Sequence, residues 1–226
     1  MANITNQQTT QINITFVPKN QVNSTLTPGD ALEVKIKEIY GDSSKPIITK
    51  FPNVFVLFDP NNQVAVNVLS EQNRIIIGDN RVTPYANRDL AKFIQFTKSS
   101  IDMILEKTQT DGIVAYGLNI LTVIDIDQAD SSKFLAEKFI NKGTSGIEFI
   151  GGGIKLIFND TIEGDVCRSV LRLDPRFAGL KLTPTKSIQI NQNFHFENAS
   201  IPDLTKLNGQ INKIYSGLPT FLAKIL

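Results

Sequence analysis

Apolar and polar residues alternate along the first third of the chain, which is the pattern of half-buried β-strands. In QINITFV, for example, Ile12, Ile14 and Phe16 occupy every second position. Turn-forming residues such as DPNN separate the alternating runs and indicate hairpins. The pattern predicts strands in the segments 11–17, 32–40, 51–58, 63–69 and 73–78.

The period changes near Leu90, where apolar residues begin to recur every three or four positions. This stripe is typical of an amphipathic helix with one side in water, and it predicts a helix from Leu90 to Leu105. The run GIVAYGLNILTVIDID (112–127) follows and is the longest β-like segment. Because both of its faces are mainly apolar, it is predicted to be a central strand buried on both sides.

The second half of the chain again combines hairpin-like and helical patterns. Its closing helix carries leucine and isoleucine at steps of three and four residues, and Gly217 with Pro219 predicts a kink or a break after Tyr215. The predicted elements are a short helix (131–143), a hairpin around three glycines (146–158), strands at 164–174, 177–182 and 186–198, and the closing helix after Ser200.

These elements indicate an α+β protein with two antiparallel or mixed sheets, each backed by an amphipathic helix. The segments 54–80 and a following helix parallel the segments 154–193 and the closing helix, so an internal duplication is one interpretation. Any chain that runs from sheet to helix would show the same order. The pattern divides the chain into a β-rich half (1–110) and an α+β half (111–226), each with a closing helix, or joins both in one continuous domain.

The charge balance bears on the kind of partner. Lysine and arginine number 23 and aspartate and glutamate 22, and the two signs are mixed along the chain. This composition lacks the basic field of a protein that neutralises many phosphates, so it disfavours a nucleic-acid binder. MANITNQQTT has no secretory pattern, no apolar run is long enough to cross a bilayer, and the single cysteine fits a reducing compartment. We therefore expect a cytoplasmic protein without a membrane partner.

Asp125 and Asp127 are the sharpest chemical lead in the sequence. Two carboxylates at i and i+2 on one strand share a face, where they could hold Mg²⁺ or Mn²⁺. A strand ending in D-I-D before a helix resembles the first metal-binding strand of palm-type polymerases and nucleotide cyclases. Those families add an acidic cluster in a later hairpin, where this chain has FIGGGIKLIF. The alternative is a strand end with two solvated aspartates.

Other chemistry-bearing residues are few. Arg168 and Arg172 share a strand face and could bind an anion, although such a pair more often faces neighbouring carboxylates. His195 is the only histidine, and the alternating pattern places it opposite its phenylalanine neighbours. Cys167 lies mid-strand, where a small buried residue is usual. The sequence assigns no catalytic residue, and an enzyme is the less favoured interpretation.

The end of the closing helix is unusually apolar. Beyond Pro219 it presents Phe221, Leu222, Ile225 and Leu226, which we expect to dock either on the protein's own core or on a partner. A second copy of the chain across a two-fold axis is the simplest partner.

Three features together are similar to a sporadic prokaryotic family of uncharacterised two-part α+β proteins. They are YGLNIL in the long strand, RLDPRF (Arg172 to Phe177) and the closing amphipathic helix. The resemblance implies a cytoplasmic prokaryotic accessory protein without an assigned activity. We therefore expect a non-catalytic binding or assembly subunit that acts through protein–protein contacts, as an oligomer or with a protein partner. The rival hypothesis is a metal-dependent phosphotransfer enzyme that uses Asp125 and Asp127.

Overall fold

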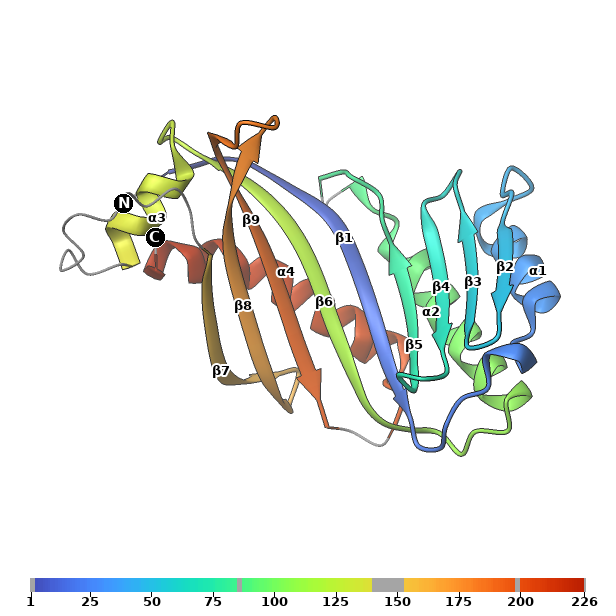
Figure 1. Ribbon diagram of the computed structural model, residues 1–226. Coiled ribbons are helices and arrows are strands. Elements are labelled where there is room, and N and C mark those ends of the chain that lie inside the picture. Colours follow the sequence, from blue (N-terminus) through green and yellow to red (C-terminus); the bar gives the residue numbers. More distant parts are fainter. Residues whose placement is uncertain (1–2, 85–86, 140–152, 198–199, 226) are drawn as a thin grey trace.

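A computed structural model describes residues 3–84, 87–139, 153–197 and 200–225. Within them, nine strands form one antiparallel sheet in the order β2-β3-β4-β5-β1-β6-β9-β8-β7 (Figure 1). The strands are β1 (Ile4–Pro18), β2 (Ile47–Phe51), β3 (Val54–Asp59), β4 (Val64–Leu69), β5 (Arg74–Asp79), β6 (Ile113–Ile126), β7 (Ile154–Ile162), β8 (Asp165–Ala178) and β9 (Thr183–Phe196).

The prediction of two separate sheets, each with its own helix, is wrong. β1 and β6 pair along their whole length, from Ile4 opposite Ile126 to Pro18 opposite Ile113. Both strands are long enough to hydrogen-bond on two sides, so β1 also pairs β5 and β6 also pairs β9. The two groups of strands therefore merge into one sheet, and the boundary between residues 110 and 111 falls in the connection between α2 and β6.

The helices are α1 (Gly29–Tyr40), α2 (Leu90–Lys107), α3 (Ser131–Phe139) and α4 (Leu204–Ile225), with a short 3-10 turn, η1 (Ser24–Leu26). Figure 1 shows α1, α2 and α4 on the same face of the sheet. The predicted burial of β6 on both sides is therefore wrong. Its residues Leu118 and Ile120 are buried under the helices, whereas Leu121 and Val123 on the other face stay partly exposed.

Segment 32–40 forms most of α1 and not the predicted strand. Leu32 and Ile36, four residues apart, are fully buried, whereas Val34 between them is 55% exposed. Lys37 pairs with Glu33 and Lys35 with Glu38 at helical spacing. A run of alternating apolar and charged residues is compatible with a strand and with a helix. Here the segment is helical, because α1 packs on α2 and the buried residues Leu32 and Ile36 are four residues apart.

The two halves of the chain have their elements in the same order. β1, α1, the strands β2 to β5 and α2 are followed by β6, α3, the strands β7 to β9 and α4. The matching strands β1 and β6 lie side by side at the centre, and the sheet order continues outward from them in opposite directions. Among the described residues the second half has one strand fewer. The duplication hypothesis rests on the parallel between segments 54–80 and 154–193, each with a following helix, and it stays a prediction.

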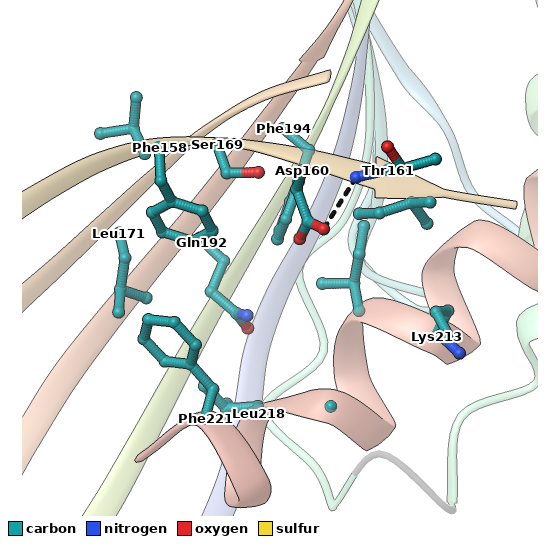
Figure 2. A pocket seen from close by; sticks show the side chains of 14 residues that line it. Phe158, Asp160, Thr161, Ser169, Leu171, Gln192, Phe194, Lys213, Leu218 and Phe221 are labelled. Atoms are coloured by element: carbon teal, nitrogen blue, oxygen red, sulfur yellow. Dashed lines mark hydrogen bonds between the residues drawn. The ribbon is translucent and has the colours of Figure 1, made fainter. Parts of the chain in front are cut away.

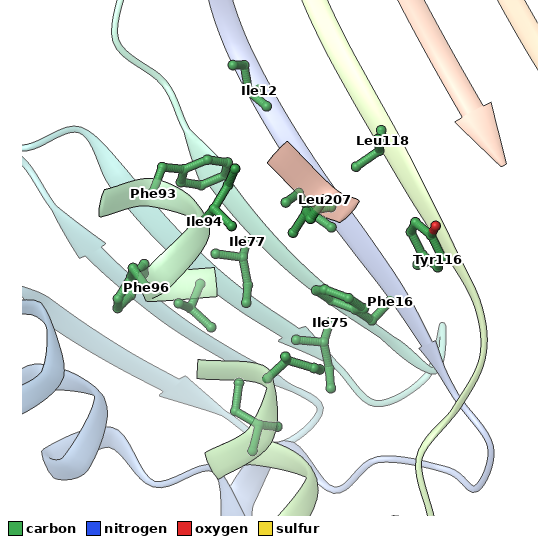
Figure 3. Packing of buried hydrophobic residues seen from close by; sticks show 14 of the residues in the cluster. Ile12, Phe16, Ile75, Ile77, Phe93, Ile94, Phe96, Tyr116, Leu118 and Leu207 are labelled. Atoms are coloured by element: carbon green, nitrogen blue, oxygen red, sulfur yellow. The ribbon is translucent and has the colours of Figure 1, made fainter. Parts of the chain in front are cut away.

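A large apolar cluster fills the space between α1, α2, the first part of α4 and the sheet. Figure 3 shows Phe93 and Ile94 of α2 and Leu207 of α4 facing Ile12 of β1 and Leu118 of β6. A second cluster lies beneath α3 and the end of α4, and it includes the following residues: Ile124, Leu135, Leu171, Ile190, Leu218 and Leu222. Polar residues on the inner face separate the two clusters, among them Thr9, Thr122 and Gln192.

α4 runs without interruption from Leu204 to Ile225, so of the kink or break predicted after Tyr215, the break is wrong. Proline costs a helix one backbone hydrogen bond. Here Leu218 and Leu222, one turn apart on either side of Pro219, are both buried in the second cluster, and this burial favours a continuous helix. Asp203 caps the start of α4 by accepting a hydrogen bond from the backbone N–H of Lys206.

Of two further predicted strand segments, one is not a separate strand and the other lies outside the described residues. The segment predicted at 177–182 is not a strand of its own, because β8 ends at Ala178 and a turn with a positive φ at Gly179 leads into β9. The first arm of the predicted glycine hairpin, 146–150, lies outside the described residues.

Candidate functional site

The face of the sheet opposite the helices carries a row of asparagines at its centre. Asn13 of β1 lies opposite Asn119 of β6, and Asn119 lies opposite Asn193 of β9. Gly78 extends the row onto β5, where a Cβ atom would come within 2.4 Å of Asn13 Oδ1. The glycine therefore makes room for the Asn13 amide on this face.

Two complete rows cross this face from β7 to β2 without a single carboxylate. Together they hold amides, hydroxyls, one guanidinium, one imidazole and apolar groups. The first row is Ile157, Val170, Asn193, Asn119, Asn13, Gly78, Ala65, Phe58 and Ile47. The second row is Asn159, Arg168, His195, Gly117, Thr15, Ile76, Asn67, Val56 and Thr49. We call these two rows, with the adjacent residues Arg74, Lys155 and Arg172, the open-face band.

Arg168 and Arg172, predicted from the sequence as anion-binding residues, both lie on this band and are exposed. Arg168 stands between Asn159 and His195 on the neighbouring strands, and Arg172 stands between Lys155 and Asn191. No ion pair between described residues includes either arginine. Neighbouring carboxylates, the usual reason for such a pair on a strand, are therefore missing from their cross-strand positions.

Lys155 and Arg74 also lie on this face without an ion pair to any described residue. Shallow hollows between the side chains connect the cations with the amides. One is lined by Asn119, Lys155, Arg172 and their neighbours, and the next by Thr15, Arg74, Arg168 and His195. The central and C-terminal part of the band thus offers hydrogen-bond donors and positive charge.

The N-terminal part of the band is apolar. Phe58 and Val56 of β3 and Ile76 of β5 are only partly buried, and the edge strand β2 exposes Ile47 by 58% and Phe51 by 59%. These residues adjoin the amide-rich part through Gly78 and Ala65 in the first row. An apolar area beside a polar, cationic one is typical of a surface that contacts another molecule.

Among the described residues, Asp125 and Asp127 do not meet further acidic groups. Asp125 accepts a hydrogen bond of 2.6 Å from the Ser187 hydroxyl, and Lys186 Nζ lies 3.5 Å from its other oxygen. The pKa of Asp125 is lowered, first by the Ser187 hydrogen bond. Asp127 accepts a hydrogen bond from the Asn3 amide. In the described part of the chain, no group of three or more His, Cys, Asp or Glu side chains could hold a metal ion.

His195 and Cys167 lie on opposite faces of the sheet. His195 pairs with Arg168 on the open-face band, whereas Cys167 pairs with Phe196 on the helix side. Cys167 is 2% exposed, and burial raises the pKa of its thiol. The thiol is therefore protonated at neutral pH and has no access to the imidazole.

The apolar end of α4 is in contact with the protein's own core. Leu222 is fully buried in the second cluster, and the ring of Phe221 stacks on Phe158 of β7 at 5.5 Å. The side chains of Ile225 and Leu226 are outside the described part. A single chain does not test whether this end also meets a partner, so the interface stays a prediction.

Comparison with known proteins assigns the chain to no family. No protein-family model matches the chain, and no curated protein matches it. The resemblance to a two-part prokaryotic family therefore stays an expectation. Among the described residues, no helix combines the length and the apolar character needed to cross a membrane.

Proposed function

We propose that this protein is a non-catalytic binding subunit, and that the open-face band is the surface with which it contacts a partner. The observation that carries the proposal is the pair of carboxylate-free rows across the sheet. The cores of protein interfaces are enriched in arginine and aromatic residues and depleted of aspartate, glutamate and lysine. The two rows contain no aspartate or glutamate, and the band includes Arg168, Arg172 and Phe58, with Lys155 as its one lysine.

The charge on the band favours a protein partner with acidic side chains. Arg74, Lys155, Arg168 and Arg172 are not paired within the described chain, so a carboxylate on the partner would gain a counter-ion without breaking an existing pair. Four cations are few for a nucleic acid, and the balanced charge of the whole chain adds no long-range attraction for phosphates. The apolar part around Phe58 and Ile47 would be covered by the same partner.

The rival function, metal-dependent phosphotransfer, has less support. Ser187 and Lys186 already satisfy both oxygens of the Asp125 carboxylate. Metal sites for phosphotransfer need several carboxylates that converge on one point. The proposal therefore assigns no catalytic residue and no Mg²⁺ or Mn²⁺.

The test reverses charge on the band. The variant Arg168→Glu/Arg172→Glu and a matched control, Lys19→Glu/Lys107→Glu, change the net charge equally, but the control residues are exposed and lie off the band. Tagged wild type and both variants are used to recover partners from the source cells, with quantitative mass spectrometry and with and without nuclease. We expect a protein that the wild type and the control recover equally and the band variant recovers at least tenfold less, because like charges then face each other.

Three results would contradict the proposal. Equal recovery by the band variant would show that the contact lies elsewhere, and loss of the partner on nuclease treatment would identify a nucleic acid instead. Equal loss by the control variant would indicate a general charge effect. Light scattering on the purified proteins adds a further distinction, because a wild-type oligomer that the band variant abolishes would identify the partner as a second copy of this chain.

A further inference from the structure

A cavity of about 170 Å³ lies between α4 and the inner face of the second half of the sheet. Figure 2 shows Phe158, Leu171 and Phe194 of the strands facing Leu218 and Phe221 of α4 across it. It sits at the boundary between the two apolar clusters, because Phe194 belongs to the first cluster and Leu171 and Leu218 to the second. It lies on the helix side of the sheet, opposite the open-face band, with which it shares the lining residue Val170.

The shape of the cavity follows from two sequence features. The stacked rings of Phe158 and Phe221, 5.5 Å apart, hold the edge strand β7 against α4 and form one wall. Gly217 lies at the mouth, where a Cβ atom would meet nothing within 4 Å. A larger side chain at this position would narrow the entrance without a backbone clash.

Gln192 gives the cavity its one deeply buried amide. This side chain of β9 is 6% exposed, and its Oε1 atom has no hydrogen-bond partner in the protein. Its neighbours on the adjacent strands are the apolar residues Ile120 and Leu171. In Figure 2 the Gln192 amide points toward Leu218 and Phe221, across the space that the other lining residues enclose. A buried carbonyl oxygen without a donor is costly, so a donor supplied by a ligand would relieve that cost.

We propose that this cavity binds an uncharged molecule of one aromatic ring that carries a single hydroxyl or N–H donor, such as a phenol. A cavity of about 150 Å³ lined by leucine, isoleucine and phenylalanine is known to accept benzene, so the volume suits one ring. The ring packs between Phe221 and Leu171, and its donor hydrogen-bonds to Gln192 Oε1. The charged residues of the lining, Asp160 and Lys213, are of opposite sign and both exposed, so no buried charge is available to pair with an ionised ligand, and an uncharged one is favoured.

The experiment compares phenol with toluene, which has a similar shape but no donor. Binding to the intact protein is measured by titration calorimetry and by ligand-observed NMR. We expect the wild type to bind phenol at least fivefold more tightly than toluene. In Gln192→Leu the preference disappears, because the acceptor is lost while the volume is nearly kept. In Gly217→Leu both ligands bind at least tenfold more weakly, because the entrance is narrowed.

The matched control is Gln189→Leu, which removes an amide of the same strand on the opposite face of the sheet. It should bind phenol like the wild type. If Gln192→Leu does not fold, Gln192→Met keeps the length of the side chain and replaces it in the comparison. Wild type that binds neither ligand at millimolar concentration would overturn the proposal. So would a phenol preference that survives in the Gln192 variant.

Discussion

The hydrogen-bond partners of Asp125 affect its titration. The Ser187 hydroxyl donates to its carboxylate at 2.6 Å, and Lys186 Nζ lies 3.5 Å away. The pKa of Asp125 is lowered chiefly by that hydrogen bond, so the folded state favours the charged carboxylate. A carboxyl group whose pKa is lower in the folded state stabilises the protein above its unfolded pKa and loses this contribution as the pH falls.

We predict that Asp125→Asn lowers the melting temperature by about 1 to 3 °C at pH 7, because the partly exposed ion pair and hydrogen bond contribute modestly. The difference from wild type should disappear near pH 2, where both states bind the proton. Scanning calorimetry at the two pH values measures it, with Asp127→Asn as the control, since Asp127 bonds only to the exposed Asn3 amide among the described residues. A difference that persists at low pH would mean that the variant perturbs packing.

Asp125→Asn and Asp127→Asn also test the hypothesis that these two aspartates bind a metal ion. We expect millimolar Mg²⁺ or Mn²⁺ to leave the melting temperature of the wild type unchanged. A rise of several degrees in the wild type that is absent in Asp125→Asn would instead support a metal site.

At the scale of single residues, the sequence could place Arg168 and Arg172 on one strand face, but it could not show what surrounds them. Their neighbours, His195 and Lys155, come from other strands, and the register between strands decides which residues meet. The row of asparagines likewise depends on the register between strands, so the sequence alone did not predict it. Asn13, Asn119 and Asn193 each follow the alternation of their own strand, but only the pairing of β1, β6 and β9 aligns them.

At the scale of elements, α1 shows where pattern reasoning fails. Leu32, Val34 and Ile36 alternate with charged residues, which predicts a strand, but the segment is helical. The ion pairs at three- and four-residue spacing were present in the sequence as Lys35–Glu38 and Glu33–Lys37, and they are the signal that could have indicated a helix. By contrast, the stripe of α2 was long enough to exclude a strand, and its prediction is confirmed for Leu90 to Leu105.

Because segment 32–40 is helical, substitutions at Leu32 and Val34 should affect the stability of the protein to different extents. We predict that Leu32→Ala lowers the free energy of unfolding by about 2 to 5 kcal/mol, because Leu32 is fully buried against the first cluster. Val34→Ala should change it by less than about 0.5 kcal/mol, since Val34 is 55% exposed. Urea denaturation measures both. Losses of similar size would be the result expected of a strand, in which the two side chains share one face.

At the scale of the whole molecule, the order of elements was visible in the sequence but the single sheet was not. The matching segments in the two halves suggested two similar units, and each unit was given its own sheet. Whether two such units stay apart or merge depends on which strands have an unpaired edge. Here β1, of 15 residues, and β6, of 14 residues, pair with each other along their edges, and this pairing joins the units.

Because β1 pairs with β6, we predict that the two halves of the chain unfold cooperatively, in one transition. The first apolar cluster contains Ile12 and Phe16 from the first half and Leu118 and Ile211 from the second, so neither half keeps its core alone. Urea unfolding followed by hydrogen exchange of peptides from β4 and from β8 should give the same midpoint.

The decisive variant is Ile211→Ala on α4, a residue of the second half that is fully buried in the first cluster. It should lower the midpoints of both β4 and β8 by the same amount, corresponding to about 2 to 5 kcal/mol, because emptying this position weakens a core that both halves share. Val66→Ala on β4, also fully buried in the first cluster, is the reciprocal variant, and it should shift both peptides together to a smaller extent. If Ile211→Ala moves only the β8 midpoint and Val66→Ala only the β4 midpoint, the halves unfold independently. The pairing of β1 with β6 would then connect two units without making them one.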